Sequence, residues 1–585
     1  MQLYSYVKQE VLNYQMSNLN DEQIDAIFNY PNGVIINASP GTGKTKTLIS
    51  RATHKLGNIP KYKKLALITY TNAGTDEISS RLTNKESVFI GTIHRFCLQF
   101  ILRPYSWIYN WGKLRVISYD EQLEFLEIND DIKLGDSPVD ELNKIKRNLD
   151  GSFNLTIEWN HNITMNELIQ RYYEYLESIT AIDFNEILYS SYKIINENDF
   201  VLKSLSNKFY EILIDEFQDT NLFQYEIFKK INQVGVSTFF MVGDEKQKIL
   251  SFAGAIDGAF PLAQNDFNLP LTFLLKTYRS TNNIVDAYSS IFDDHPPLEN
   301  ESVYNSFNIP LIKKEFDYRN NTLENRINES VEYLINQCDI KIEQIAILSK
   351  TWFDAYNVSK FLRSNYNIIG LGALPHSMTN IKNSTFELLK CLVRFKILSS
   401  IKNLKALRRS FESHLSENNI MFNDEEKVII FNRLLKRFRE IDKLLFLEDG
   451  LIEINNLFDE LLVIEHNTFS EIINMISDDE IDYWNLEKYF RALSNSGGIL
   501  STTIHQSKGL EFEAVILNQM NLGKVPHQNY IAAERAYEDL TVANYEEGKR
   551  VFYVALSRAR KHLIITHNWK PSMFVNLLTE NESFR

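Results

Sequence analysis

The sequence predicts an α/β fold with two parallel-sheet domains, and three observations carry this prediction. Short apolar segments each end in a polar cluster, such as the run 34–37, which is followed by ASPGTGKT. Helix-compatible sequence separates these segments, and near-continuous apolar strands joined by helices are typical of a parallel sheet covered on both faces. The chain has 585 residues, enough for several cores at about 150 residues per domain.

Composition excludes several classes of protein. The net charge of −14 argues against a simple polybasic nucleic-acid binder, although a local basic groove is compatible with it. With 44% hydrophobic and 24% charged residues, the chain is expected to be globular rather than disordered. Its three cysteines form no CxxC pair, which disfavours a disulfide scaffold, an iron–sulfur cluster and a multi-cysteine zinc site. We read no signal peptide and no apolar run near the roughly 20 residues of a membrane helix, so we expect a soluble cytoplasmic protein with no membrane partner.

The first half of the chain carries one series of apolar segments that end in polar clusters. Ligands bind outside the carboxyl ends of the strands in parallel sheets, so these clusters are candidates for a binding site. The expected strands are 34–37, 65–69, 88–90, 212–214 and 238–242.

A second series predicts a second α/β domain, with strands expected at 344–348, 499–504, 514–517 and 562–566. Two intervening stretches have helical periodicity and lack strand-end clusters, so we interpret them as helical insertions. The expected organisation is a first domain of residues 1–97 and 184–282 with the insertion 98–183, and a second domain of residues 283–392 and 496–585 with the compact insertion 393–495.

The segment after the first expected strand has the pattern of a phosphate-binding loop. Small residues let backbone N–H groups wrap phosphates, and the following helix adds its positive dipole end. Lys44 is expected to reach the β- and γ-phosphates, and the Thr45 hydroxyl to bind Mg²⁺. The alternative is an ordinary glycine turn, and the first position is alanine rather than glycine. The loop comprises Ala38, Ser39, Pro40, Gly41, Thr42, Gly43, Lys44 and Thr45.

Two carboxylates, Asp215 and Glu216, follow the apolar run 212–214. Adjacent side chains of an extended chain point to opposite sides, so Asp215 can face a metal ion and Glu216 the attacking water. Alone, such a pair is more often a solvated turn. Together with the loop, it predicts hydrolysis of a nucleoside triphosphate with Mg²⁺.

A series of short motifs runs along the chain: LNDEQ at 19–23, ASPGTGKT at 38–45, TYTN at 69–72, GTIH at 91–94, DF at 183–184, DEFQDTN at 215–221, VGDEKQ at 242–247, YRST at 278–281, TIHQSKGLEF at 503–512 and YVALSRA at 553–559. In order and spacing these motifs resemble those of the UvrD/Rep/PcrA-type superfamily 1 helicases, from about residue 19 to residue 566. The resemblance implies two RecA-like parallel-sheet P-loop motor domains, each with a mostly helical insertion, and an arginine finger in the second.

The resemblance also implies roles on the nucleotide side. Gln23 and Tyr278 are expected to contact the adenine of ATP, and Glu511 its ribose; taken singly, each has a structural alternative. ATP is expected between the two domains, so that binding closes the cleft and hydrolysis releases it. The implied catalytic set is Lys44, Glu216, the γ-phosphate sensor Gln247 and the two clamping arginines Arg279 and Arg558.

For DNA, the resemblance implies a track along which a single strand is gripped. Its expected members are Tyr70, Thr71, Asn72, Thr92, His94, Phe252 and His505; for Phe252 the alternative is a core phenylalanine. The chain departs from the family where Leu250 stands for an aromatic residue and Ala253 for an arginine. Lys248 adds a positive charge nearby, at a different position. These changes bear on the strength of the motor and not on ATP chemistry.

The resemblance implies an ATP-dependent 3′–5′ translocase or helicase acting on single-stranded or tailed duplex DNA, as in DNA repair. The altered grip and compact insertions leave an alternative: a DNA-stimulated ATPase that licenses a partner nuclease, with weak or no unwinding, like the helicase-like subunit of Gabija-type antiviral defence systems. No appended nuclease domain is expected, since 26 residues follow the last motif. An RNA helicase is disfavoured, because no RNA-recognition module is recognisable.

Overall fold

The computed structural model divides the chain into two compact units. Unit 1 comprises Met1–Arg279 with Pro296–Glu301, and unit 2 comprises Ser280–His295 with Ser302–Arg585. The residues that the structure describes are 18–82, 85–109, 114–132, 134, 138–153, 163–250, 254–317, 322–375, 378, 383–418, 420–462, 473–474, 481, 484–527 and 540–579.

Unit 1 contains a six-stranded sheet in the order β3-β2-β6-β7-β1-β8, and every pairing in it is parallel. The central strands are buried on both faces, which explains why they read as continuous apolar runs. The edge strand β8 was not foreseen from the sequence. The strands are β1 (Gly33–Ala38), β2 (Lys64–Thr69), β3 (Val88–Thr92), β6 (Phe209–Ile214), β7 (Thr238–Gly243) and β8 (Leu271–Leu274).

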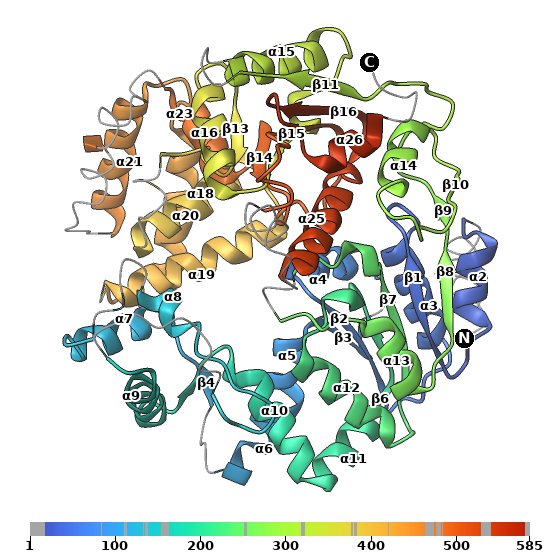
Figure 1. Cartoon of the computed structure of the whole chain (residues 1–585). Helices are drawn as coiled ribbons and strands as arrows, with labels where there is room; N and C mark the ends of the chain where they lie inside the picture. Colours follow the sequence, from blue (N-terminus) through green and yellow to red (C-terminus); the bar gives the residue numbers. More distant parts are fainter. Residues whose placement is uncertain are drawn as a thin grey trace, which may run out of the picture. The chain divides into compact units, whose positions relative to one another are not determined.

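Helices cover both faces of this sheet (Figure 1). On β1, Val34 and Ile36 pack toward α2 (Asp21–Phe28), α3 (Lys44–Leu56) and α4 (Asn72–Arg81). Ile35 points to the other face, as the two-residue period of a strand requires. That second face is covered by α5 (Ile93–Cys97), α10 (Glu186–Glu197), α11 (Asp199–Lys208), α12 (Leu222–Gln233) and α13 (Ala259–Phe267).

The stretch expected as the first insertion is mainly helical where the structure describes it. Its own small core includes Phe125, Leu168 and Tyr172, and the two-residue strands β4 (Arg115–Val116) and β5 (Ala181–Ile182) pair in parallel. Its helical elements are η1 (Leu98–Leu102), α6 (Arg103–Tyr105), η2 (Ser106–Tyr109), α7 (Tyr119–Ile128), α8 (Pro138–Leu142) and α9 (Met165–Ser178).

Unit 2 contains a second six-stranded, all-parallel sheet, in the order β11-β16-β15-β12-β14-β13. Its central strands β12 and β15 pack against α15 (Thr322–Asn336) and α16 (Trp352–Leu362). Other helices of this unit are α14 (Asn282–Ser289), α25 (Leu540–Leu556) and α26 (Met573–Thr579), and the strands are β11 (Ile312–Glu315), β12 (Ile345–Ser349), β13 (Ile368–Gly370), β14 (Ile499–Thr503), β15 (Phe512–Asn518) and β16 (Ala559–His567).

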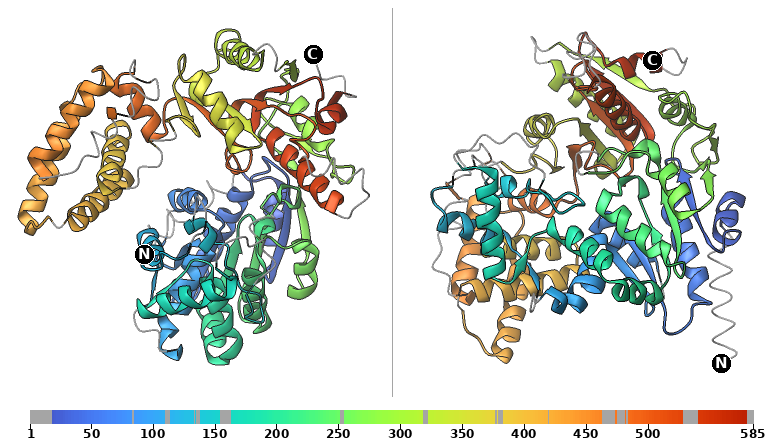
Figure 2. Two further views of the ribbon diagram at one scale, coloured as in Figure 1. Left: turned by 60° about the vertical axis from the view of Figure 1, so that its left-hand side comes forward. Right: turned by 60° about the horizontal axis from the view of Figure 1, so that its bottom comes forward.

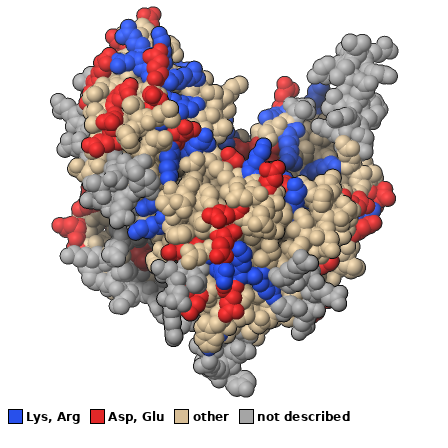
Figure 3. All heavy atoms as spheres, turned by 90° about the horizontal axis from the view of Figure 1, so that it is seen from above, with Lys and Arg blue, Asp and Glu red and all other residues tan. Residues whose placement is uncertain are grey.

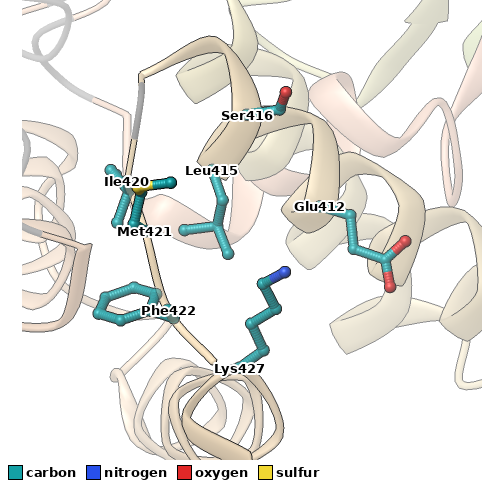
Figure 4. Close-up of a pocket in the computed structure, with 7 residues that line it drawn as sticks. All are labelled: Glu412, Leu415, Ser416, Ile420, Met421, Phe422 and Lys427. Carbon is teal, nitrogen blue, oxygen red and sulfur yellow. The ribbon is translucent and has the colours of Figure 1, made fainter. Parts of the chain in front are cut away.

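A bundle of long helices, gold to orange in Figure 2, completes unit 2. A single apolar cluster that includes Leu389, Leu451 and Trp484 holds it together. Between its second and third helices lies an open pocket of about 410 Å³, drawn in Figure 4, which Lys427 and Phe422 help to line. Its helices are α18 (Ser384–Ile397), α19 (Ile401–Glu417), α20 (Asp424–Glu440), α21 (Leu447–Leu462) and α23 (Leu486–Ser494).

The two parallel sheets with their helices confirm the predicted fold class. The exact domain boundaries stay predictions. The expected border at residue 393 falls within α18, and 280–295 belong to unit 2. Within the described residues, no helix has the length and apolar character needed to cross a membrane.

Candidate nucleotide-binding site

The loop between β1 and α3 is shaped to present backbone N–H groups. Gly41 and Gly43 have φ of +76° and +85°, a left-handed conformation that glycine adopts at little cost. Gly43 caps the amino end of α3, and the Thr42 hydroxyl donates back to the Ser39 carbonyl at 2.8 Å. The loop therefore curls around the positive end of a 13-residue helix.

Lys44 folds back over this loop. Its ammonium donates to the carbonyl oxygens of Ala38 at 2.7 Å and of Ser39 at 3.2 Å. The cation is therefore held beside the loop, and its contact with the phosphates stays a prediction.

The two predicted adenine contacts, Gln23 and Tyr278, are linked through Asn20, which caps the amino end of α2. Gln23 is buried; its amide donates to the Thr42 carbonyl at 2.9 Å, and it forms a capping box with Asn20. Asn20 in turn donates to the Tyr278 hydroxyl at 2.9 Å. Tyr278 is 39% exposed, so part of its ring is open to a ligand. A side-chain amide has two N–H donors, and the described bond uses one of them.

A short segment leading to Arg279 is tied to the loop. The Thr277 hydroxyl donates to the Pro40 carbonyl at 2.8 Å, and the Tyr278 N–H donates to the Gly41 carbonyl at 3.0 Å. A Cβ atom placed on Gly41 would lie 2.6 Å from Cβ of Arg279. Only glycine therefore allows Arg279 to come this near the phosphate loop within unit 1.

The same segment continues into unit 2, where it is anchored to the residues after α25. The Ser280 hydroxyl donates to the Ala559 carbonyl at 2.6 Å. The Thr281 N–H donates to the Arg560 carbonyl at 2.9 Å. One covalent strap, residues 277–281, therefore connects the phosphate loop with the stretch that contains Arg558.

The expected metal ligand Asp215 directly follows β6 at the carboxyl edge of the sheet. Burial, and secondarily the neighbouring charge of Glu216, raise the pKa of Asp215 to about 7. A divalent cation bound here would stabilise the charged form of this carboxylate. The described residues hold no group of three or more His, Cys, Asp or Glu side chains suited to a metal. A hard ion completed by phosphate oxygens and water needs no such group, so Asp215 and Thr45 fit Mg²⁺.

Glu216 and Gln247 are joined by a hydrogen-bond network that the sequence did not reveal. The Gln218 amide donates to the Glu216 carboxylate at 2.5 Å, and its oxygen accepts from the Asp244 N–H at 2.9 Å. The Gln247 amide donates to the Asp244 carboxylate at 2.7 Å. Glu216 itself has φ of +52°, a strained conformation for a residue with a Cβ atom. The network thus fixes both predicted catalytic side chains across neighbouring strands.

In unit 2, Arg558 is buried and bonded to its own unit. Its guanidinium donates to the carbonyls of Val554 at 3.0 Å and Leu510 at 3.2 Å. The expected ribose contact Glu511 forms an ion pair with Arg560. Both residues adjoin the amino ends of β15 and β16, opposite to the edge from which His505 emerges after β14.

The expected DNA track follows the carboxyl ends of strands. In unit 1, Tyr70, Thr71 and Asn72 follow β2, and Thr92 caps the amino end of α5. His94 stacks on Phe184 with ring centroids 3.9 Å apart, and burial lowers its pKa to about 4. Its imidazole is therefore neutral at physiological pH. Of the other predicted members, His505 lies in unit 2 and Phe252 lies outside the described residues.

The hypothesis that Lys248 supplies a replacement cation does not hold. Its side chain is buried and pairs with Asp257, so its charge is already neutralised. Leu250 leaves no aromatic surface at its position, and Ala253 lies outside the described residues. On the face drawn in Figure 3, lysines and arginines are interspersed with acidic side chains.

Sequence reasoning also missed a buried ion pair beneath the site. The Arg51 guanidinium binds the Glu211 carboxylate of β6 at 2.6 Å and donates to the Tyr30 carbonyl at 2.8 Å. It thereby connects the phosphate-loop helix, the strand that ends at Asp215 and the end of α2. The capping box of α2, by contrast, can be recognised in the sequence, because an Asn with a Gln three residues later begins many helices.

Fold and site together define the class of P-loop proteins with two RecA-like domains. Residues 19–268 match the family model described as the UvrD/REP helicase N-terminal domain, and residues 399–570 match the UvrD-like helicase C-terminal domain. The chain belongs to the UvrD-type superfamily 1 helicases.

Relatives of known name extend this assignment along the chain. A probable DNA helicase II homolog of Mycoplasma genitalium is 24% identical, over 96% of this chain and 88% of its own. The ATP-dependent DNA helicase PcrA of Staphylococcus epidermidis is 24% identical, over 96% and 85%. The ATP-dependent DNA helicase Rep of Buchnera aphidicola is 23% identical, over 94% and 93%.

Proposed function

We propose that this chain is an ATP-dependent DNA translocase and helicase that moves 3′ to 5′ along single-stranded DNA. Two observations carry the ATP part: the Lys44 ammonium is held over the phosphate loop, and a chain of hydrogen bonds through Gln218 and Asp244 joins Glu216 to Gln247. The DNA part rests on family membership and on the relatives named above. The direction rests on the resemblance alone.

In this proposal each residue of the nucleotide-binding site has its own role. The loop amides and Lys44 bind the phosphates, and Gln23 with Tyr278 holds the adenine. Mg²⁺ bound at Thr45 and Asp215 supplies a positive charge that offsets the charge developing on the phosphates. Glu216 orients the attacking water and accepts its proton.

Arginines complete the proposed mechanism. Arg279 already lies beside the loop. In the ATP state, Arg558 breaks its hydrogen bonds to the Val554 and Leu510 carbonyls and approaches the γ-phosphate. A planar guanidinium spreads positive charge over the equatorial oxygens of the transferred phosphoryl group. The strap 277–281 transmits the change, because its two ends are bonded to the loop and to residues 559–560. Repeated closing and opening would then move a gripped strand.

A strand-displacement assay tests this function. Duplexes with a 3′ or a 5′ single-stranded tail are incubated with the protein and ATP, and Lys44→Ala serves as the inactive control. We expect release of the labelled strand from the 3′-tailed duplex only. Release from the 5′-tailed duplex alone would overturn the direction. DNA-stimulated ATP turnover without any release would favour the alternative of an ATPase that licenses a partner, for which Leu250 is the motivating observation.

A further inference from the structure

Aromatic side chains at the start of α16 are exposed on unit 2 and have no part in the proposed site. Trp352 is 42% exposed and the adjacent Phe353 is 64% exposed. The rings of Trp352 and Tyr356 stack, with centroids 5.1 Å apart and planes inclined by 14°. They lie four residues apart on the helix and so share one face of it. The pair forms a flat aromatic surface that exists before any ligand binds.

This surface lies at the edge of the sheet from which His505 also emerges. Ser349 ends β12 and pairs with Thr503, which ends β14. The Ile504 N–H donates to the Ser349 carbonyl at 2.9 Å. Trp352 follows the first of these neighbouring strands by three residues, and His505 follows the second by two. The aromatic pair and His505 therefore follow the carboxyl ends of adjacent strands, at the same edge of the sheet.

Cationic groups accompany this edge. Burial, and secondarily the positive charges of Lys350 and Lys508, lower the pKa of His505 to about 4. Lys350 also lies 3.8 Å from Glu547, a long ion-pair distance. The buried carboxylate of Asp354 accepts from the Lys524 ammonium at 2.6 Å, which neutralises it. Lys350 and Lys508 therefore bring positive charge to this edge of the sheet.

We propose that Trp352, backed by Tyr356, is a base-stacking platform for single-stranded DNA in unit 2. Proteins that hold single strands combine cationic groups for the backbone with aromatic faces on which bases stack. Both elements are present here, and the stacked pair is already ordered, so less conformational entropy is lost when a base adds to it. The inference rests on the proposed function, since it concerns the same DNA.

In unit 1 the resemblance expects an aromatic residue where Leu250 stands, and Lys248 there is neutralised by Asp257. Unit 2 has an exposed aromatic surface of its own in Trp352 and Tyr356. An exposed aromatic face could instead receive a protein partner, and the experiment separates the two possibilities.

The test compares the full-length wild-type chain with Trp352→Ala, Trp352→Phe and the matched control Trp107→Ala. Trp107 is a 63% exposed tryptophan in unit 1, in η2, that packs beside Phe200. Two fluorescein-labelled probes of equal length and charge are used: oligothymidylate and an oligomer of abasic deoxyribose phosphates. Fluorescence anisotropy gives the Kd of each.

We expect Trp352→Ala to raise the Kd for oligothymidylate on the order of tenfold, the effect of losing one base–aromatic stack. The Kd for the abasic probe should not change, Trp352→Phe should retain most of the affinity, and Trp107→Ala should behave as wild type. An oligothymidylate Kd unchanged by Trp352→Ala would overturn the platform and point to a protein surface. An equal loss on both probes would also overturn it, since the cause would not be stacking. Failure of the wild type to bind either probe would contradict the proposed function itself.

Discussion

The hydroxyl of Thr277 donates a 2.8 Å hydrogen bond to the carbonyl oxygen of Pro40, in the middle of the phosphate loop. Two residues after Thr277 comes Arg279, and one residue later the chain enters unit 2. The bond is buried, so if it is lost, neither the hydroxyl nor the carbonyl can form a hydrogen bond with water instead. The loop that is proposed to bind phosphates is thereby in direct contact with the strap that leads to the second motor unit.

Replacement of Thr277 by valine removes this donor at nearly constant shape. A net hydrogen-bond contribution of about 1 kcal/mol corresponds to roughly a fivefold rise in KM for ATP. Steady-state ATPase kinetics measure it. Thr53→Val is the matched control, because Thr53 donates within α3 to the Ile49 carbonyl at 2.8 Å. A KM for ATP equal in both variants would contradict a role for the strap in holding the loop.

Replacement of Gly41 by alanine tests the close approach of Arg279 to the loop. The new Cβ would lie 2.6 Å from the Thr277 hydroxyl oxygen and 2.6 Å from Cβ of Arg279, at φ of +76°. We expect ATP binding to fall below detection in equilibrium titration. Gly235→Ala has a similar φ of +73° with no atom within 4 Å of the added Cβ, so it carries the backbone strain alone, about 1 kcal/mol. If both variants lost ATP binding, the cause would be backbone strain and not the contact of the new Cβ with Thr277 and Arg279.

Replacement of Glu216 by glutamine keeps its size and removes its charge. ATP binding should persist, whereas kcat should fall by about 10²–10⁴, the usual contribution of a general base. Rapid-quench and binding measurements separate the two quantities. The exposed Glu177, at the end of α9, provides the control variant Glu177→Gln, which should retain wild-type kcat. Wild-type kcat in Glu216→Gln would remove Glu216 from the mechanism.

The raised pKa of Asp215 predicts a pH-dependent stability. A folded-state pKa near 7, against the ordinary value of 3.8, means that the folded protein holds a proton which the unfolded chain releases. This contribution to stability is therefore lost as pH rises from about 4 to about 7. Asp215→Asn removes the penalty, so its Tm relative to wild type should be higher at pH 8 than at pH 5, by roughly 1–2 °C for each kcal/mol. Thermal melts without nucleotide measure this difference. An equal Tm difference between variant and wild type at both pH values would contradict the raised pKa of Asp215.

Much of the fold was predictable because parallel strands buried on both faces leave long apolar runs. Five of the six strands in the main sheet of unit 1 were identified in this way: β1, β2, β3, β6 and β7. The strands β8, β11 and β13 were missed, since they lie at sheet edges or are only three or four residues long. Lys313 and Lys314 in β11 break the apolar pattern on which the prediction depended.

The site was predictable where a local motif carries it and not where distant residues meet. Lys44 and Asp215 stand in recognisable patterns, and the structure places both at the carboxyl edge of one sheet. Gln218 and Asp244, which connect Glu216 with Gln247, are separated by 26 positions and have no periodic signature. Arg51 and Glu211 are 160 positions apart, and their pairing follows only from the packing of α3 on β6.

The central claim is that this chain couples ATP hydrolysis to single-stranded DNA, and DNA-stimulated turnover tests it most directly. Phosphate release is measured at saturating ATP with and without oligothymidylate, with Lys44→Ala as the blank. The account predicts a clear rise in kcat on addition of DNA, and no turnover above background in Lys44→Ala. Turnover that is indifferent to DNA, or that persists in Lys44→Ala, would contradict it.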